Sequence, residues 1–190
     1  GRPVFGVDFK IVDADGKAQP HDGTARGELL VRGPWVTSGY YEDAAANKNA
    51  FDGDGWFRTG DVATIHPDGW MKIVDRVKDL IKSGGEWISS IDLENAAIGH
   101  PDVQEAAAIS VPHPKWLERP LLFVVPKPGA KPERESVLRH LATRLAKWQM
   151  PDDVVFVGEL PHTATGKLLK SELRQRFKDH KLANTGAPAA

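Results

Sequence analysis

The sequence predicts a mixed α/β chain of the α+β type, in two parts that differ in how their segments alternate. Residues 1–75 hold short β-forming stretches at close spacing with glycine turns between them, which is typical of a small β-barrel-like subdomain or an open sheet. From residue 76 onward, strand-like segments alternate with helical ones. The boundary is placed at Asp75 or Arg76, inside a charge cluster, and a cluster at a domain boundary suggests a hinge.

In the first part, the β-forming stretches predict four strands, at residues 4–12, 27–33, 56–65 and 70–75. Asp13–Gly16 is an Asp-Gly turn after the first of them, and residues 67–69 form a hairpin turn before the last. A short helix is expected over Asp43–Ala50.

In the second part, Ser89 or Ser90 is expected to cap a helix over residues 91–98, which Gly99 ends. Apolar spacing of 3.6 residues predicts a helix over 133–148, and a closing helix is expected over 171–180. Strands are expected at residues 103–111, 121–125 and 154–157. The domain is taken to end at residue 181, because residues 182–190 are small, Pro/Gly-containing and expected to be disordered.

Composition excludes several function classes. The formal net charge of −1 gives no global basic field, so no nucleic-acid partner is expected. The absence of cysteine excludes disulfides, thiolate catalysis and Cys-ligated zinc. No apolar run approaches the roughly 20 residues of a membrane span, and no secretory signal opens the chain, so a cytoplasmic protein is expected. Because Gly1 runs straight into strand-like sequence, we expect a piece of a longer protein.

The segment Asp75–Ile88 carries the most concentrated charge. Read as a strand, it places Arg76, Lys78 and Lys82 on one face with Leu80, because strand side chains alternate. The glycine pair that follows allows a turn with φ > 0 or the close approach of a ligand. Such a basic strand suits a phosphorylated ligand, and an exposed hairpin with a solvated basic edge fits the same residues.

Two further motifs carry candidate chemistry. Asp61 follows a Thr-Gly step, where a fixed carboxylate can accept hydrogen bonds from both hydroxyls of a ribose or can hold local backbone amides. Lys167 lies in a Thr/Gly loop just ahead of the closing helix, where a bound phosphate or carboxylate would offset its charge, unless it is a solvated loop lysine. The histidines lack metal-ligand spacing, so no metal site is predicted.

Three motifs in this order, at residues 55–61, 75–88 and 161–170, together resemble the acyl-CoA synthetase branch of the acyl-adenylate-forming enzymes. Weaker matches lie at Gly27–Tyr41 and at Glu118-Arg119-Pro120-Leu121. Residues 86–94 and 112–116 look most like medium- and long-chain fatty-acid and methylthio-acid CoA ligases. The resemblance implies ATP-dependent formation of an acyl-adenylate, from which the thiol of coenzyme A then displaces AMP.

The resemblance also implies roles for the charged residues. Asp61 would hold the ribose hydroxyls of ATP and AMP, and Arg76 would contact the ribose or a phosphate. Lys167 would bridge the α-phosphate and the substrate carboxylate, stabilising charge in the transition state of adenylation. Lys78 and Lys82 would face the nucleotide or the coenzyme.

A second set of implied roles concerns movement. Asp75 would be the hinge about which a mobile lid, residues 76–181, rotates between the two steps. After rotation, Gly84, Gly85 and Glu86 would line the path of the pantetheine arm of coenzyme A.

The phosphate loop and the acyl pocket of this family are not found in the sequence. The resemblance therefore implies that residues 1–75 are the last β subdomain of a large AMP-binding domain, whose missing N-terminal part would hold most of the Mg²⁺ contacts. The 190-residue chain is expected to be inactive alone. A stand-alone nucleotide- or CoA-binding module remains an alternative, as does another relative, either a peptide-synthetase adenylation domain or a luciferase-like oxygenase.

Overall fold

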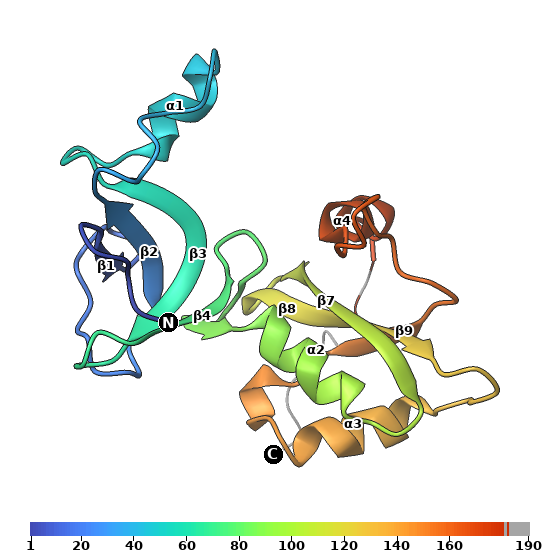
Figure 1. The fold of residues 1–190 in the computed structure, drawn as a ribbon. Helices are drawn as coiled ribbons and strands as arrows, with labels where there is room; N and C mark the ends of the chain where they lie inside the picture. The colour runs from blue at the N-terminus through green and yellow to red at the C-terminus, as the bar shows by residue number, and fades with distance from the viewer. Residues whose placement is uncertain (181, 183–190) are drawn as a thin grey trace. The chain divides into compact units, whose positions relative to one another are not determined.

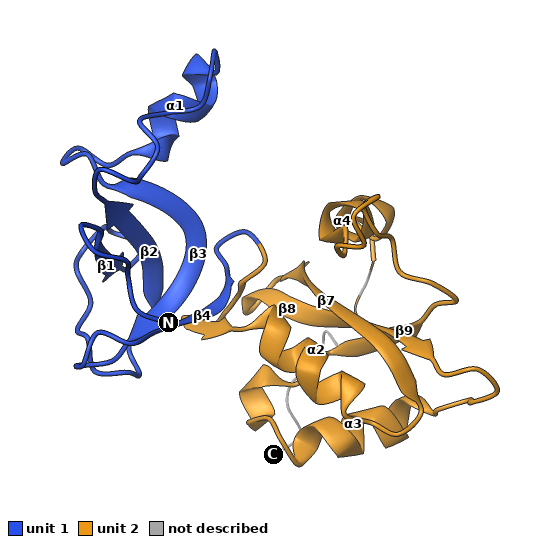
Figure 2. Ribbon diagram, in the orientation of Figure 1, with its two compact units in different colours: residues 1–78 blue, residues 79–190 orange. Residues whose placement is uncertain are grey.

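The protein forms two compact units, Gly1–Lys78 and Asp79–Ala190, in a computed structural model that describes residues 1–180 and residue 182 (Figure 2). The division between them falls after Lys78, whereas the charge cluster places a boundary at Asp75 or Arg76. Each unit has its own sheet and its own hydrophobic core.

The first unit is a four-stranded antiparallel sheet (Figure 1). Its strands pair in chain order as β1 (Asp8–Val12), β2 (Gly27–Arg32), β3 (Phe57–Ile65) and β4 (Met71–Arg76). Since β1 and β4 are the edges and do not pair with each other among the described residues, the sheet is open. Of the two forms that the sequence allowed, the open sheet is confirmed and closure into a barrel is not found.

Alternation along the strands builds the core of this unit. Ile11, Leu29, Ala63 and Ile65 are buried together from three neighbouring strands, with Phe9, Val31 and Met71 packed against them. The helix α1 (Ala44–Ala50) follows Asp43, whose side chain accepts a hydrogen bond from the Ala46 amide. An Asp at this position satisfies an otherwise unpaired amide of the first turn, which explains the predicted helix start.

The second unit is built on a five-stranded sheet. Its strands are β5 (Ile81–Ser83), β6 (Glu86–Ile88), β7 (Val103–His113), β8 (Leu117–Pro126) and β9 (Asp153–Phe156). The order is β6-β5-β8-β7, and β9 pairs with β8 in the one parallel contact among the described residues. The helices are α2 (Ser90–Ile98), α3 (Arg134–Ala142) and α4 (Lys170–Arg176), with a 3₁₀ turn at Lys147–Gln149.

Both faces of the central part of the β7–β8 pair are buried, which explains why residues 106–109 and 121–125 are all apolar. Ala106, Ala108, Leu122 and Val124 pack with α2 and α3, in a cluster that holds Leu93, Val137 and Leu141. The alternate residues Ala107, Ile109, Leu121 and Phe123 pack on the other face with Leu173 of α4. Successive side chains of a strand point to opposite faces, so a strand that is covered on both faces requires apolar residues at consecutive positions.

Two predicted helices differ from those in the structure. The helix predicted over 133–148 ends at Ala142, where the Thr143 hydroxyl donates to the carbonyl of His140 and satisfies one of the last free acceptors. The closing helix spans Lys170–Arg176 instead of 171–180. Leu182, assigned from sequence to the tail, is buried in the second cluster of this unit, and residues 183–190 lie outside the described residues.

Candidate functional site

The carboxylate of Asp61 and the guanidinium of Arg76 form an ion pair across β3 and β4. Arg76 Nε lies 2.8 Å from Asp61 Oδ1, and the two residues are direct partners in the strand register. The Asp61 side chain is 20 % exposed and that of Arg76 is 57 % exposed. The pair therefore presents an anchored carboxylate and a largely solvated cation at the same place on the sheet.

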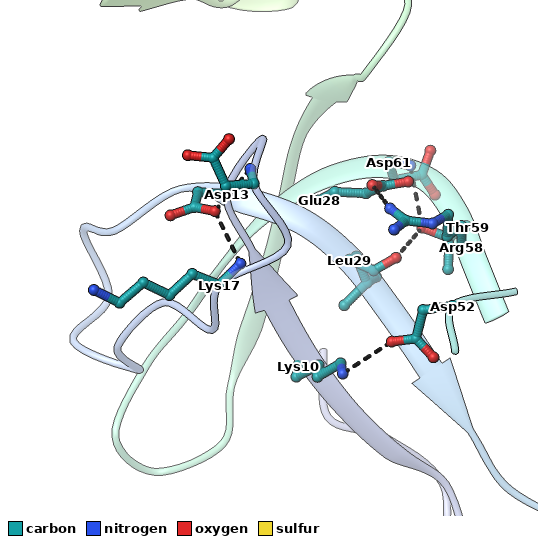
Figure 3. Close-up of polar contacts among 10 residues, drawn as sticks. Lys10, Asp13, Lys17, Glu28, Leu29, Asp52, Arg58, Thr59 and Asp61 are labelled. Atoms are coloured by element: carbon teal, nitrogen blue, oxygen red, sulfur yellow. Dashed lines mark hydrogen bonds and ion pairs between the residues drawn. The ribbon is translucent and has the colours of Figure 1, made fainter. Parts of the chain in front are cut away.

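The backbone around Asp61 is fixed by its neighbours (Figure 3). The Thr59 hydroxyl donates to the carbonyl of Leu29 at 2.9 Å and accepts from the Asp61 amide at 3.1 Å. Gly60 has φ +73°, a left-handed conformation that a residue with a Cβ adopts at a cost. Thr59 is therefore hydrogen-bonded to Leu29 of β2, and the turn at Gly60 places the Asp61 carboxylate directly after this anchored residue.

The turn before β3 is organised by Asp52. Its carboxylate accepts hydrogen bonds from the amides of Asp54 and Trp56 at 3.0 and 2.9 Å. It also accepts one from the ammonium of Lys10 at 3.1 Å (Figure 3). Burial raises the pKa of Asp52, but the Trp56 amide and Lys10 lower it more, so the net pKa lies below the usual value. The cationic groups of Lys10 and Arg32 lie 4.6 and 4.4 Å from the centroid of the Trp56 ring.

Asp75 is 1 % exposed and lies within β4, opposite Val62. Its side chain accepts the amide hydrogen of Arg76 at 2.7 Å. The junction 75–76 therefore belongs to the sheet of the first unit, and the division between the units follows it.

The prediction of one continuous basic strand from residue 76 to residue 82 is wrong. Val77–Asp79 form a turn, and Lys78 and Lys82 lie in different units. Leu80 is 4 % exposed, whereas a regular strand would place it on the charged face. Burying this side chain requires the chain to turn, which breaks the row of charges.

The glycine pair forms the turn of the β5–β6 hairpin, as predicted. Ser83 and Glu86 are paired, and the two residues between them, Gly84 and Gly85, have φ of +60° and +90°. Two-residue hairpin turns of the I′ type require positive φ at both positions. Glu86 and Lys82, on either side of the turn, are exposed.

The turn between β7 and β8 supports this glycine turn. The Gly84 amide donates to the carbonyl of Trp116 at 2.9 Å, and a Cβ built on Gly84 would lie 2.8 Å from Trp116 Cε3. The Lys82 amide donates to Glu118 Oε2 at 2.8 Å. The β5–β6 loop therefore fits against an aromatic ring that leaves no room for a side chain at position 84.

Arg119 forms hydrogen bonds that connect β5 to residues 148–152. Its guanidinium donates to Ser83 Oγ, to Asp152 Oδ1 and to the carbonyls of Trp148 and Met150. The side chain is 12 % exposed. Sequence reasoning found Arg119 only within a weakly matching motif, because its partners Asp152 and Trp148 are distant in sequence.

Lys167 lies on a separate loop. The Thr163 amide donates to the Lys167 carbonyl at 2.8 Å, and the Lys167 amide donates to the Thr163 hydroxyl at 3.1 Å. Gly166, with φ +77°, completes the turn. Lys167 is exposed, and no hydrogen bond or ion pair joins its ammonium to another described residue. Its backbone is held while its charge stays accessible.

Apart from Lys78, which lies in the turn at residues 77–79, the predicted site residues form three groups. Asp61, Asp75 and Arg76 come together in β3 and β4 of the first unit. In the second unit, Lys82, Gly84, Gly85 and Glu86 share the β5–β6 hairpin, and Lys167 lies on a separate loop.

Within residues 1–180 and 182, no group of three or more His, Cys, Asp or Glu side chains could hold a metal ion. In that same range, no helix has the length and apolar character to cross a membrane.

Two protein-family models match the chain. The AMP-binding enzyme C-terminal domain matches residues 92–167, which include most of α2, all of β7 and β8, and the loop up to Lys167. The AMP-binding enzyme model matches residues 1–41 of the first unit.

Curated relatives and solved structures agree with these models. The 3-methylmercaptopropionyl-CoA ligase of Ruegeria lacuscaerulensis is 56 % identical over 94 % of this chain, and the long-chain-fatty-acid–CoA ligase of Thermus thermophilus is 51 % identical over 95 %. The ATP-bound crystal structure of MatB from Rhodopseudomonas palustris matches 94 % of this chain with a TM-score of 0.84 and 36 % identity.

The chain covers 33 % of each of these two ligases and 35 % of the MatB chain, about a third of their length. The matches lie in the C-terminal part of the ligases. Two segments of the chain thus match models of the AMP-binding enzymes, and the two curated relatives named above are CoA ligases.

Proposed function

We propose that this chain is the C-terminal part of an ATP-dependent acyl-CoA ligase, which activates a carboxylic acid as acyl-AMP and transfers the acyl group to coenzyme A. The observation that carries the proposal is the accessible ammonium of Lys167 on a hydrogen-bonded turn, within residues that match the AMP-binding C-terminal domain. The relatives at 56 % and 51 % identity, named as methylmercaptopropionyl- and long-chain-fatty-acid ligases, support a fatty or methylthio acid as substrate.

Lys167 is proposed to act in adenylation. Its charge would bridge the α-phosphate and the attacking carboxylate, where negative charge concentrates in the transition state. No proton transfer is required of it. Because the turn already holds the backbone of Lys167, less conformational entropy is lost when the residue binds ATP and the acid.

Asp61 and Arg76 are proposed to bind the nucleotide. The Asp61 carboxylate has a second oxygen beyond the one paired with Arg76, and carboxylates bind vicinal hydroxyls in this way. Arg76 is exposed enough to reach the ribose or a phosphate. Lys78 and Lys82, both exposed, are proposed to face the nucleotide or the coenzyme.

The turn at Gly84 and Gly85 is proposed to line the path along which coenzyme A enters. Gly84 and Gly85 carry no side chain, so the pantetheine arm can approach the backbone, with Glu86 beside it. Asp75 is proposed as the hinge between the two half-reactions. Because Arg76 is paired with Asp61 in β4, rotation at Asp75 has to release that pairing.

The proposed partners follow from this reaction. They are a carboxylic acid, ATP, coenzyme A and the N-terminal part of the ligase, with no nucleic acid. Mg²⁺ would be held mainly by that N-terminal part together with the phosphates of ATP. The proposed location is the cytoplasm. The 190-residue chain alone is proposed to be unable to form acyl-adenylate.

The test is a separation of the two half-reactions in the full-length ligase. Lys167→Ala is expected to lower acid-dependent pyrophosphate release about 10²–10³-fold, the scale of removing one electrostatic contact to a transition state. Thioester formation from supplied acyl-adenylate should stay near wild type. Lys178→Ala, changed at an exposed lysine of the same unit, is the matched control and should alter neither step.

Equal loss in both half-reactions would contradict the role of Lys167. A panel of carboxylic acids scored by AMP release then identifies the substrate. If no acid supports AMP release while the protein still binds ATP or coenzyme A, the chain belongs to a non-catalytic binding module.

A further inference from the structure

Lys170 is a second lysine close to the end of the chain, and it is buried. Its side chain is 10 % exposed, and its ammonium lies 2.6 Å from Glu94 Oε1 in α2. The same ammonium donates to Ser90 Oγ at 2.7 Å. Glu94, whose side chain is 13 % exposed, also accepts the Ala108 amide of β7 at 2.8 Å. One contact therefore joins α4, α2 and β7.

Local preferences do not explain this lysine. Lys170 is the first residue of α4, where the helix dipole disfavours a cation. Burying an ammonium costs further free energy unless a carboxylate lies against it. An extended side chain in solvent would avoid both costs, so the Glu94 carboxylate is what holds Lys170 inside.

The ion pair lies at the end of the loop that carries Lys167. Leu168 forms a β-bridge with His162, and the Leu169 amide donates to the carbonyl of Pro161 at 2.8 Å. The two arms of the loop are thus paired, and the second arm continues directly into Lys170. Four residues further along α4, Arg174 pairs with Asp79 at 2.5 Å. The helix after the loop is fastened by two charged contacts to the rest of the unit.

We propose that Lys170 is a positioning residue for Lys167. Its ion pair with Glu94 holds the 161–169 loop in one position relative to α2. Lys170 itself is proposed not to contact the substrate. Two of the three ammonium hydrogens point to Glu94 and Ser90, and the side chain is almost out of solvent. This rests on the proposed function, which gives Lys167 its role.

The first test uses the 190-residue chain and needs no activity. Lys170→Met keeps the apolar length of the side chain and removes its charge. Backbone amides of residues 161–169, followed by hydrogen exchange and mass spectrometry, should exchange about tenfold faster or more, because the arm loses its fixed point. Peptides from β7 and β8 should be unchanged. Lys178→Met, at an exposed position, is the matched control. Unchanged exchange in the loop overturns the positioning role.

The second test uses the full-length ligase. Lys170→Met and Glu94→Gln should each lower the kcat of adenylation about tenfold or more, with the KM for ATP and the thioester half-reaction unchanged. The double variant should be no worse than the more damaged single variant, since both remove one contact. Lys170→Arg, which keeps the charge, should recover most of the rate. A structural defect would instead lower both half-reactions and would not be recovered by charge.

The two tests separate the two proposals. Unchanged adenylation in Lys167→Ala overturns the role proposed for Lys167. A loss in Lys167→Ala together with unchanged adenylation in Lys170→Met overturns the positioning role alone. Additive losses in the double variant overturn the positioning role, because they show that Lys170 and Glu94 act independently.

Discussion

Arg76 lies directly opposite Asp61 in the β3–β4 pairing, with its Nε 2.8 Å from the carboxylate. The two residues belong to separate sequence motifs, and both are proposed to bind the nucleotide. The pairing means that one residue at the end of β4 orients the carboxylate that would hold the ribose. Exposed ion pairs contribute about 0–1 kcal/mol to stability, so we expect this pair to matter for binding more than for folding.

Asp61→Asn in the full-length ligase is therefore expected to raise the KM for ATP about 10–100-fold, because hydrogen bonds to a charged group contribute about 1.5–3 kcal/mol. The melting temperature of the chain should change little. Steady-state kinetics and calorimetry measure the two effects. Asp68→Asn, at an exposed carboxylate paired with Arg2, is the control and should affect neither. An unchanged KM for ATP would rule out the ribose contact.

The glycine turn allows a test of close packing. Gly84→Ala and Gly85→Ala both place a Cβ at positive φ, which costs about 1–2 kcal/mol. Only at Gly84 would the Cβ meet a neighbour, since Trp116 Cε3 lies 2.8 Å away and nothing lies within 4 Å at Gly85. Urea unfolding should show the larger loss for Gly84→Ala.

The control for this comparison is the pair of variants Trp116→Ala and Gly84→Ala/Trp116→Ala. In the background without the ring, the alanine at 84 should cost no more than the alanine at 85. Equal losses for the two glycines in the native background would show that the ring moves aside freely.

Arg119→Ala is expected to destabilise the second unit by about 3–5 kcal/mol, the cost of breaking a buried ion pair while leaving its partner in place. Its guanidinium donates to Asp152 and to three further groups, at 12 % side-chain exposure. Arg119→Lys should recover part of the lost stability, because an ammonium keeps the charge but can replace only some of the guanidinium hydrogen bonds.

Calorimetry of the chain measures this loss, with Arg2→Ala as the surface control, where the Arg2 side chain is 62 % exposed. Equal melting of the two variants would show that the Arg119 network is not needed for the fold.

A pH effect is expected at the contact between α2 and α3. Burial, with Arg144 and His100 nearby, lowers the pKa of His140 below its usual 6.5. Its Nε2 lies 3.1 Å from the Ala96 carbonyl and its Nδ1 3.3 Å from Arg144. The unfolded chain therefore binds a proton at higher pH than the folded one, and this site reduces stability as pH falls below about 6.5. The loss levels off below the folded pKa.

The measurement is urea unfolding between pH 7.5 and 5. His140→Gln should flatten the decline of stability in this range, and His66→Gln, at an exposed position in the other unit, is the matched control for the substitution. A decline of the same steepness in wild type and His140→Gln would show that other groups cause it.

Much of the fold could be predicted because its signals are local. The Asp-Gly and Gly-Gly turns, the Ser89 cap of α2 and the apolar runs of β7 and β8 each encode their structure within a few residues. The Glu133–Trp148 helix was predicted too long, because the apolar spacing continues past Thr143 while the cap there ends the helix. The basic strand from Arg76 to Lys82 was predicted wrongly, because alternation alone does not show that Leu80 has to be buried.

The sequence by itself determined the two-part order of elements and the motifs that hold Asp61, Arg76 and Lys167, since turns, caps and alternation depend on neighbours along the chain. Only the tertiary structure decided that Asp61 pairs with Arg76, that Trp116 covers Gly84 and that Glu94 holds Lys170. These contacts join residues far apart in sequence. Their formation depends on strand register and on which side chains the packed core leaves within reach, and no short stretch of sequence records either.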